Sequence, residues 1–325
     1  MTNLTVVPSE LLPPREPERR HLLSVADLSR DDVERLLATA RSFALSQARD
    51  TKKLPTLRGR LVVSLFFEAS TRTSSSFELA AKRLSADTLS VKASGSSVEK
   101  GESLRDTALT LSAYDPDVIV IRHPQIGASH LVARVTEAHV VNAGDGKHQH
   151  PTQALLDLYT IQGALGRLEG VHVAIVGDVL HSRVARSLVQ ALRLVGAQVT
   201  LVGPPPLVPR ELGDTSHEIE AISGADVVYV LRMQRERMEE GANFVPSLRE
   251  YSARWCVTPE RLRPGQKVMH PGPINRGVEI DPRVADSPDA LVVDQVRAGL
   301  VVRMAVLYDL LTTGPVAVQT AVEVA

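Results

Sequence analysis

The chain has 325 residues, 43% hydrophobic and 23% charged, a composition typical of a soluble globular protein. The formal net charge is −1, from 37 basic and 38 acidic residues, so no global field attracts nucleic acid or a membrane surface. No apolar run approaches the roughly 18 residues of a membrane span. The single cysteine, Cys256, excludes an intramolecular disulfide and fits a reducing compartment. A chain of this length is expected to form two domains.

Apolar strand-like runs alternate with amphipathic helical patterns along most of the chain. Residues 1–20 carry four prolines and no signal-peptide pattern, and we expect them to be a disordered tail. The expected strands lie near 61–67, 88–93, 117–122, 139–143, 171–177, 198–203, 226–231, 267–269 and 291–293. The expected helices are 31–45, 75–85, 102–113, 127–137, 151–164, 182–195 and 295–312. This alternation predicts an α/β fold with two doubly wound parallel-sheet domains joined by interdomain helices.

A hydroxyl-rich turn, Ser70-Thr71-Arg72-Thr73, separates the first strand from the helix expected over 75–85. Ser75 and Glu78 have the spacing of a capping box, which predicts that this helix begins near Ser75. Hydroxyls and a guanidinium beside free helix N–H groups favour a phosphate site. A plain Ser/Thr helix cap with a solvated Arg72 remains an alternative for this segment taken alone.

Two further strand ends in the first half carry polar groups. Strand 117–122 ends in Arg122, and the strand near 139–143 leads to His150-Pro151-Thr152-Gln153. Proline suits the first helical position, so His150 is expected at the N-cap with Gln153 close by. Together with Arg122 they can bind a carbonyl and a phosphate, although an ordinary capping histidine also fits. The ligand spacing predicts no metal site around His148 and His150.

Strand ends of the second half present arginines and a rigid turn. Arg183 opens the helix after Gly177-Asp178, Arg232 follows strand 226–231, and His270-Pro271-Gly272-Pro273 follows strand 267–269. Arginine meets carboxylates with a two-pronged fork, so Arg183 and Arg232 are placed to hold a small dicarboxylate, unless they are surface or capping arginines. The Gly-x-Gly-x-x-Gly fingerprint of dinucleotide sites and the Gly-x-Ser-x-Gly elbow of hydrolases are both missing.

Taken in order, these motifs resemble those of the aspartate/ornithine carbamoyltransferase superfamily, and most closely the aspartate carbamoyltransferase catalytic chain. The matching motifs are Ser70–Thr73, Arg122–Pro124, His150–Gln153, Arg183, Arg232–Gln234 and His270–Pro273. The resemblance covers about residues 21–312. It implies transfer of the carbamoyl group of carbamoyl phosphate to L-aspartate, giving N-carbamoyl-L-aspartate and phosphate in pyrimidine biosynthesis, without a cofactor or metal.

The resemblance also implies a role for each matching residue. The carbamoyl-phosphate site would consist of Ser70, Thr71, Arg72, Thr73, Arg122, His150 and Gln153. Among these, Thr73, Arg122 and His150 would be catalytic, because they would polarise the carbonyl oxygen. The aspartate site would consist of Lys100, Arg183, Arg232, Gln234, Gly272 and Pro273. Ser96 and Lys100, in a polar glycine-bearing loop, would reach the site of a neighbouring subunit; taken alone, this loop reads as an ordinary solvated one.

The implied organisation follows the two substrates. Residues 21–150, completed by the C-terminal helix 295–325, would form the carbamoyl-phosphate-binding domain, and residues 151–294 the aspartate-binding domain. The implied assembly is a cytoplasmic homotrimer with sites at subunit interfaces, open to a larger complex with regulatory or dihydroorotase-like chains. Neither nucleic acid nor membrane is an expected partner.

Three positions depart from the family pattern, and several alternatives stay open. Ala69 stands where a proline is common, Ser74 where an arginine is common, and Gly272 where some members have a larger apolar residue. These changes concern the helix entry and affinity more than the reaction. The alternatives are transfer to another amino acid such as ornithine, a non-catalytic relative acting as a scaffold or allosteric subunit, and a nicotinamide-dependent redox protein, which the missing glycine fingerprint disfavours.

Overall fold

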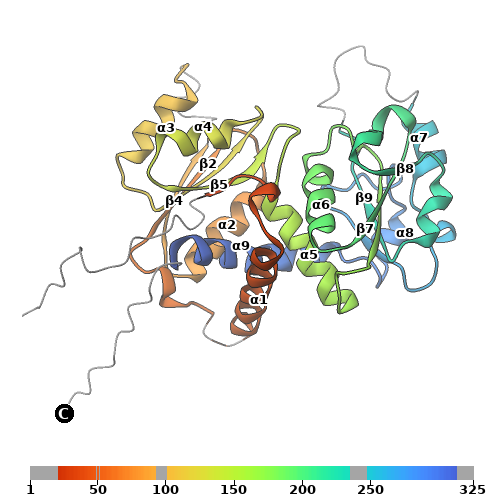
Figure 1. Cartoon of the computed structure of the whole chain (residues 1–325), viewed down its shortest axis with the longest axis horizontal. Helices are drawn as coiled ribbons and strands as arrows, with labels where there is room; N and C mark the ends of the chain where they lie inside the picture. Colours follow the sequence, from red (N-terminus) through yellow and green to blue (C-terminus); the bar gives the residue numbers. More distant parts are fainter. Residues whose placement is uncertain (1–20, 49, 51, 93–100, 235–246, 313–325) are drawn as a thin grey trace, which may run out of the picture.

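The computed structural model describes residues 21–312 except 49, 51, 93–100 and 235–246. These residues form two five-stranded sheets, each with helices packed against it (Figure 1). Every strand pair in both sheets is parallel. The predicted fold class is therefore confirmed. Within the ranges just given, no helix is both long and apolar enough to cross a membrane.

The first sheet has the strand order β1-β5-β4-β2-β3. Its central strands are buried almost throughout, because helices cover both faces of a parallel sheet. The carboxyl ends of all five strands lie at one edge, which is where such sheets place their ligands. The strands are β1 (His21–Leu22), β2 (Leu61–Phe66), β3 (Asp87–Lys92), β4 (Val118–His123) and β5 (His139–Asp145).

The second sheet has the order β10-β9-β6-β7-β8. Its middle strands are short apolar runs, and β9 is buried at all four positions. The strands are β6 (His172–Val176), β7 (Gln198–Val202), β8 (Asp214–Ser216), β9 (Val227–Val230) and β10 (Lys267–Met269).

Helices cover the sheets and join them. On the first sheet, α3 and α4 lie on one face and α1, α2 and α9 on the other, while α5 runs between the two sheets (Figure 1). The described helices are α1 (Arg30–Gln47), α2 (Thr71–Arg83), α3 (Leu104–Ser112), α4 (Ala128–Val135), α5 (Pro151–Leu165), α6 (Arg183–Leu194), α7 (Leu248–Trp255), α8 (Pro282–Ala285) and α9 (Val292–Thr312).

Helices α5 and α9 contribute to the hydrophobic core that connects the two sheets. Both are apolar nearly all round, and α5 contacts α6 as well as α9, while α9 also packs on α1 and α2. A helix without a polar face has to be buried on all sides. A single apolar cluster accordingly runs from strands of the first sheet to strands of the second.

Several predicted boundaries were wrong. Of the segment 291–293, expected as a strand, Val292 and Val293 are the first residues of helix α9. Helix α2 starts at Thr71, one turn before the predicted start. The short elements β1, β8, α7 and α8 were not predicted, because each is too short for a clear apolar period. The expected tail 1–20 and the helix end beyond residue 312 lie outside the described residues.

Candidate active site

The Ser70–Thr73 turn forms the first turn of α2. Ser70 is the N-cap, and its hydroxyl accepts the Thr73 N–H at 3.4 Å. The predicted capping box at Ser75 and Glu78 was wrong: Glu78 instead forms an ion pair with Lys82 at 2.6 Å. Residues 71–73 therefore lie in the turn whose N–H groups have no acceptor within the helix. This arrangement combines backbone donors, hydroxyls, a guanidinium and the positive helix end.

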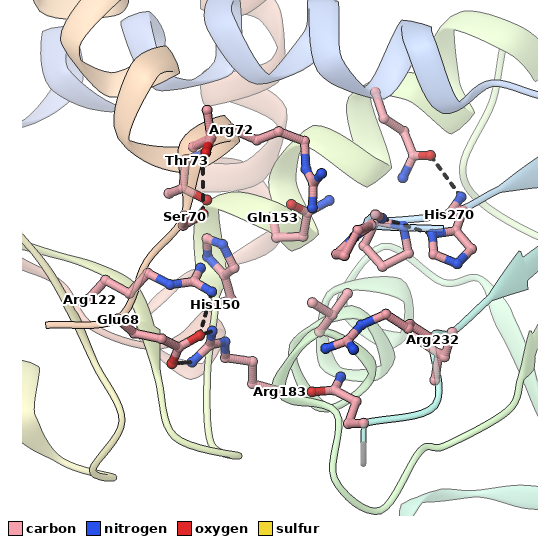
Figure 2. A pocket seen from close by; sticks show the side chains of 18 of the residues that line it. Glu68, Ser70, Arg72, Thr73, Arg122, His150, Gln153, Arg183, Arg232 and His270 are labelled. Atoms are coloured by element: carbon pink, nitrogen blue, oxygen red, sulfur yellow. Dashed lines mark hydrogen bonds and ion pairs between the residues drawn. The ribbon is translucent and has the colours of Figure 1, made fainter. Parts of the chain in front are cut away.

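Glu68 joins the two halves of the site and was not among the residues predicted from the sequence. Its carboxylate contacts Arg122 Nη2 at 2.7 Å and Arg183 at 2.6 and 3.0 Å (Figure 2). Burial favours the neutral acid, but hydrogen bonds and charges from Arg183 and Arg122 outweigh it and lower the pKa of Glu68 to about 2. An acidic residue between a strand end and the hydroxyl-rich turn was the available signal.

Arg183 is almost fully buried, at 2% exposure, although it opens helix α6. It also donates to the Gly146 carbonyl at 3.2 Å. Gly144, with φ of +118°, lets it approach, since a Cβ there would lie 2.9 Å from Arg183 Nε. The surface or capping alternative for Arg183 is thereby excluded, and its carboxylate partner in this structure is Glu68.

The N-terminus of α5 is built as predicted, with His150 at the N-cap and Pro151 at the first helical position. His150 is 3% exposed, and its backbone N–H donates to Ser187 Oγ of α6 at 2.8 Å. Gln153 donates its side-chain amide to Asp157 Oδ1, one turn further along the helix, at 3.1 Å. The contact with α6 therefore helps to fix where this helix end lies.

On the second sheet, Arg232 and Gln234 follow β9. The backbone N–H of Gln234 donates to Asp178 Oδ2 at 3.2 Å, which ties this segment to the loop after β6. Figure 2 shows Arg232 directed into the cavity opposite Arg72. Burial, followed by the charge of Arg232, lowers the pKa of Arg72, as expected where two cations face one space.

The turn His270–Pro273 carries a cis peptide bond between Gly272 and Pro273. His270 is buried, its Nδ1 accepts the Gly272 N–H at 2.8 Å, and its backbone N–H donates to Gln295 Oε1 at 2.9 Å. Gly272 has φ of +67°, and a Cβ there would lie 2.8 Å from Arg72 Cζ. The arginine of the α2 turn thus rests against the backbone of a turn from the second sheet.

These groups surround a single cavity of about 1340 Å³ between the sheets. Every predicted site residue that the structure describes lines it. These are Ser70, Thr71, Arg72, Thr73, Arg122, His150, Gln153, Arg183, Arg232, Gln234, Gly272 and Pro273. Ser96 and Lys100 lie outside the described residues.

The cavity is strongly basic. Arg276 and Arg303, which were not among the predicted site residues, add to its arginines, and Glu68 is the only carboxylate among the described lining residues. Between residues 21 and 312, leaving aside the gaps, no group of three His, Cys, Asp or Glu residues is placed to hold a metal ion. A space lined by arginines, hydroxyls and a helix N-terminus suits a ligand with several negative charges.

Two family models match nearly the whole chain. The one described as aspartate/ornithine carbamoyltransferase, carbamoyl-P binding domain, matches residues 20–163, and the Asp/Orn binding domain of the same family matches residues 169–310. The aspartate carbamoyltransferase catalytic subunit of Salinispora arenicola is 55% identical over 303 residues, which are 90% of this chain and 98% of the relative. The Mycobacterium bovis subunit of the same name is 55% identical over 306 residues, covering 90% and 95%.

Solved structures agree with this relationship. Aspartate transcarbamoylase from Trypanosoma cruzi, in complex with carbamoyl aspartate and phosphate, superposes with a TM-score of 0.83 at 33% identity, covering 92% of this chain and 98% of that one. The catalytic subunit of the M. jannaschii aspartate transcarbamoylase gives 0.79 at 36% identity, covering 90% and 97%. With both family models matched in order and relatives above half identity, the chain belongs to the aspartate/ornithine carbamoyltransferase family.

Proposed function

We propose that the protein transfers the carbamoyl group of carbamoyl phosphate to L-aspartate, giving N-carbamoyl-L-aspartate and phosphate. The observation that carries this is the meeting of two basic half-sites in one cavity, the α2 turn with Arg122 on one side and Arg183 with Arg232 on the other. A phosphate and a dicarboxylate together match that charge. The T. cruzi relative, whose structure contains carbamoyl phosphate and aspartate, supports the same pair of substrates.

On the phosphate side, Ser70, Thr71, Arg72 and Thr73 would bind the phosphate through hydroxyls, backbone N–H groups and the guanidinium. Their position at the N-terminus of α2 supports this, because helix N-termini favour anions. Thr73, Arg122 and His150 would polarise the carbonyl oxygen, and Gln153 would bind the carbamoyl amide. These groups line the cavity from α2, β4 and α5.

On the aspartate side, Arg183, Arg232 and Gln234 would bind the two carboxylates. Backbone carbonyls near Gly272 and Pro273 would orient the amine. Glu68 keeps Arg183 and Arg122 in one orientation across the cavity, so the guanidiniums meet the substrates already placed. Preorganised donors of this kind lose little entropy when the substrate binds.

The reaction needs positioning and charge stabilisation more than a protein nucleophile. The amine nitrogen of aspartate forms a bond to the carbonyl carbon, and the carbonyl oxygen becomes negative beside Thr73, Arg122 and His150. The bond from that carbon to the phosphate oxygen then breaks, and the departing phosphate takes up the amine proton. One oxyanion donor of this type contributes about 3 kcal/mol to the transition state.

We also propose the organisation that goes with this activity. Residues 21–150 with the C-terminal helix would form the carbamoyl-phosphate domain, and residues 151–294 the aspartate domain. The protein would act in pyrimidine biosynthesis as a homotrimer, in which Ser96 and Lys100 complete the site of a neighbouring subunit; relatives named catalytic subunits support this. It would be cytoplasmic, which fits a chain with a single cysteine. Sedimentation of the purified chain measures the trimer directly.

Steady-state assays with aspartate and ornithine, side by side, test the reaction. We expect carbamoyl transfer to aspartate and none to ornithine, because two arginines face the acceptor. Arg232→Ala should raise the KM for aspartate about 10- to 100-fold, since a charged hydrogen bond is lost. Arg283→Ala, which removes an exposed arginine paired with Asp281 and Glu260, is the control. Transfer to ornithine, or an unchanged KM in Arg232→Ala, would contradict the assignment.

A further inference from the structure

Asp157 is a buried carboxylate directly behind the proposed carbamoyl site. It lies on α5, is 0% exposed, and does not line the cavity. Three donors from three elements converge on it: Gln153 Nε2 of α5 at 3.1 Å, Gln295 Nε2 of α9 at 2.7 Å, and the Tyr229 hydroxyl of β9 at 2.7 Å. A buried carboxylate is costly unless such donors satisfy it, so its presence calls for a reason.

The carboxylate decides which way the Gln153 amide faces. An ionised carboxylate only accepts hydrogen bonds, so the amide has to turn its Nε2 group toward Asp157. The Oε1 atom is then the polar end left for the cavity that Gln153 lines (Figure 2). Gln153 therefore meets a ligand as a hydrogen-bond acceptor, which is what the NH₂ of a carbamoyl group requires.

The same carboxylate orients Gln295. With Nε2 donating to Asp157 Oδ1, the Oε1 atom of Gln295 accepts the backbone N–H of His270 at 2.9 Å. That contact anchors the His270–Pro273 turn on the aspartate side. Asp157 thus connects Gln153, on the phosphate side, with the His270–Pro273 turn on the aspartate side. Both connections depend on Asp157 Oδ1, which accepts hydrogen bonds from Nε2 of Gln153 and Nε2 of Gln295.

We propose that Asp157 is a positioning residue that makes the site select an acyl phosphate bearing an N–H group, by holding Gln153 as an acceptor. The proposal rests on the proposed function. A site built to accept a hydrogen bond discriminates against an isostere that lacks the donor. Acetyl phosphate is that isostere, because a methyl group replaces the NH₂ of carbamoyl phosphate.

The test compares Asp157→Asn with the wild type for carbamoyl phosphate and acetyl phosphate. Burial raises the pKa of Asp157 to about 7, opposed by its three donors and the Arg303 charge, so the assays are run at about pH 8.5, where the carboxyl is ionised. In the asparagine variant, an NH₂ donor replaces one of the two accepting oxygens. Where that NH₂ group faces Gln153, the Gln153 amide can turn its Nε2 toward the cavity. We expect the KM for carbamoyl phosphate to rise about 10-fold or more, while the inhibition constant of acetyl phosphate stays within about twofold.

Tyr229→Phe is the matched control. It removes another hydrogen bond to the same carboxylate but leaves both glutamines facing Asp157 Oδ1. We expect the ratio of the two affinities to stay at the wild-type value in this variant. An Asp157→Asn protein that loses both ligands equally, or neither, overturns the proposal, because a merely structural carboxylate would not separate the two acyl phosphates.

A second measurement keeps the test valid if Asp157→Asn does not fold. In the wild type, the preference for carbamoyl over acetyl phosphate should fall about threefold or more between about pH 8.5 and 6, as Asp157 takes up a proton. Arg303 of α9 and the Tyr229 hydroxyl of β9 are the charged and titratable groups that face it. A constant ratio over this range overturns the proposal. Calorimetry measures the affinities for carbamoyl phosphate and acetyl phosphate directly, without aspartate and without turnover. A wild type that binds both ligands but does not transfer the carbamoyl group would therefore contradict the proposed function and not the role of Asp157.

Discussion

Gly272 is the residue at which the two half-sites come closest. Its φ of +67° belongs to the left-handed region, and its missing side chain leaves room for the Arg72 guanidinium. The position of Arg72, the arginine proposed to bind phosphate, thus depends on a turn about 200 residues further along the sequence.

Replacing Gly272 by alanine should disturb Arg72 beyond the cost of backbone strain. We expect the free energy of unfolding to fall by about 1–2 kcal/mol, because a side chain is forced into the left-handed region. The KM for carbamoyl phosphate should rise about 3- to 10-fold, because the added Cβ would displace the guanidinium by contact at 2.8 Å. Urea unfolding and initial rates measure the two effects.

Gly277→Ala provides the matched control for this prediction. Gly277 has φ of +80° and nothing within 4 Å of a Cβ, so the substitution brings strain without a clash. It should lower stability by a similar amount and leave the KM unchanged. If both variants changed the KM equally, the contact with Arg72 would not be the cause.

At the scale of elements, the site depends on how helix ends are held. The N-terminus of α5 is anchored by α6, where Ser187 Oγ accepts the His150 N–H at 2.8 Å and donates to Gln149 Oε1 at 2.7 Å. Both partners are buried, so neither has water as a substitute. The contact fixes His150 through its backbone and leaves its imidazole directed toward the cavity (Figure 2).

Ser187→Ala should therefore lower the free energy of unfolding by about 2 kcal/mol, because two buried polar groups lose their partner. The rate of carbamoyl transfer should fall several-fold as the helix end shifts. Ser129→Ala is the control, because that serine is 1% exposed and its hydroxyl has no hydrogen-bond partner among the described residues. Denaturant unfolding of both variants checks the prediction, which fails if the two lose the same stability.

At the scale of the whole molecule, Glu68 links the first sheet to the second. Its carboxylate, which follows β2, contacts Arg183 at the start of α6 and Arg122 at the end of β4. Because its folded pKa of about 2 is below the ordinary value of 4.5, the link stabilises the fold above pH 4.5 and is lost as the pH falls through about 2.

Glu68→Gln should destabilise the protein at neutral pH by about 2 kcal/mol, less than for a fully buried pair because Glu68 is 29% exposed. The difference from the wild type should shrink as the pH falls below about 4.5. Urea midpoints measured from neutral pH to the most acidic folded condition give this profile. Glu78→Gln, which removes an exposed pair within α2, should change little at any pH. A difference that persists at low pH would mean that the charge of Glu68 is not responsible.

The features that could be predicted from the sequence alone are local in origin. Apolar period and flanking turns are enough to locate most strands and helices, and Pro151 is enough to place His150 at an N-cap, because these depend on neighbours within one turn. Ligands bind at the carboxyl ends of parallel strands, and this rule indicated where the site residues should meet. Every predicted site residue within the described part of the chain lines one cavity. The start of α2 was misplaced: the Ser75–Glu78 spacing predicted a start near Ser75, but the helix begins at Thr71 with Ser70 as its N-cap.

Which side chains meet across the two sheets depends on the tertiary fold and could not be predicted from the sequence. Glu68 and Asp157 were not predicted as site residues, and all their partners named above except Gln153 lie 54 to 138 residues away along the chain. The approach of Arg72 to Gly272 likewise depends on how the sheets are set against each other by α5 and α9. Local patterns carry no information on such distances, so these contacts follow from the packed core that joins both halves.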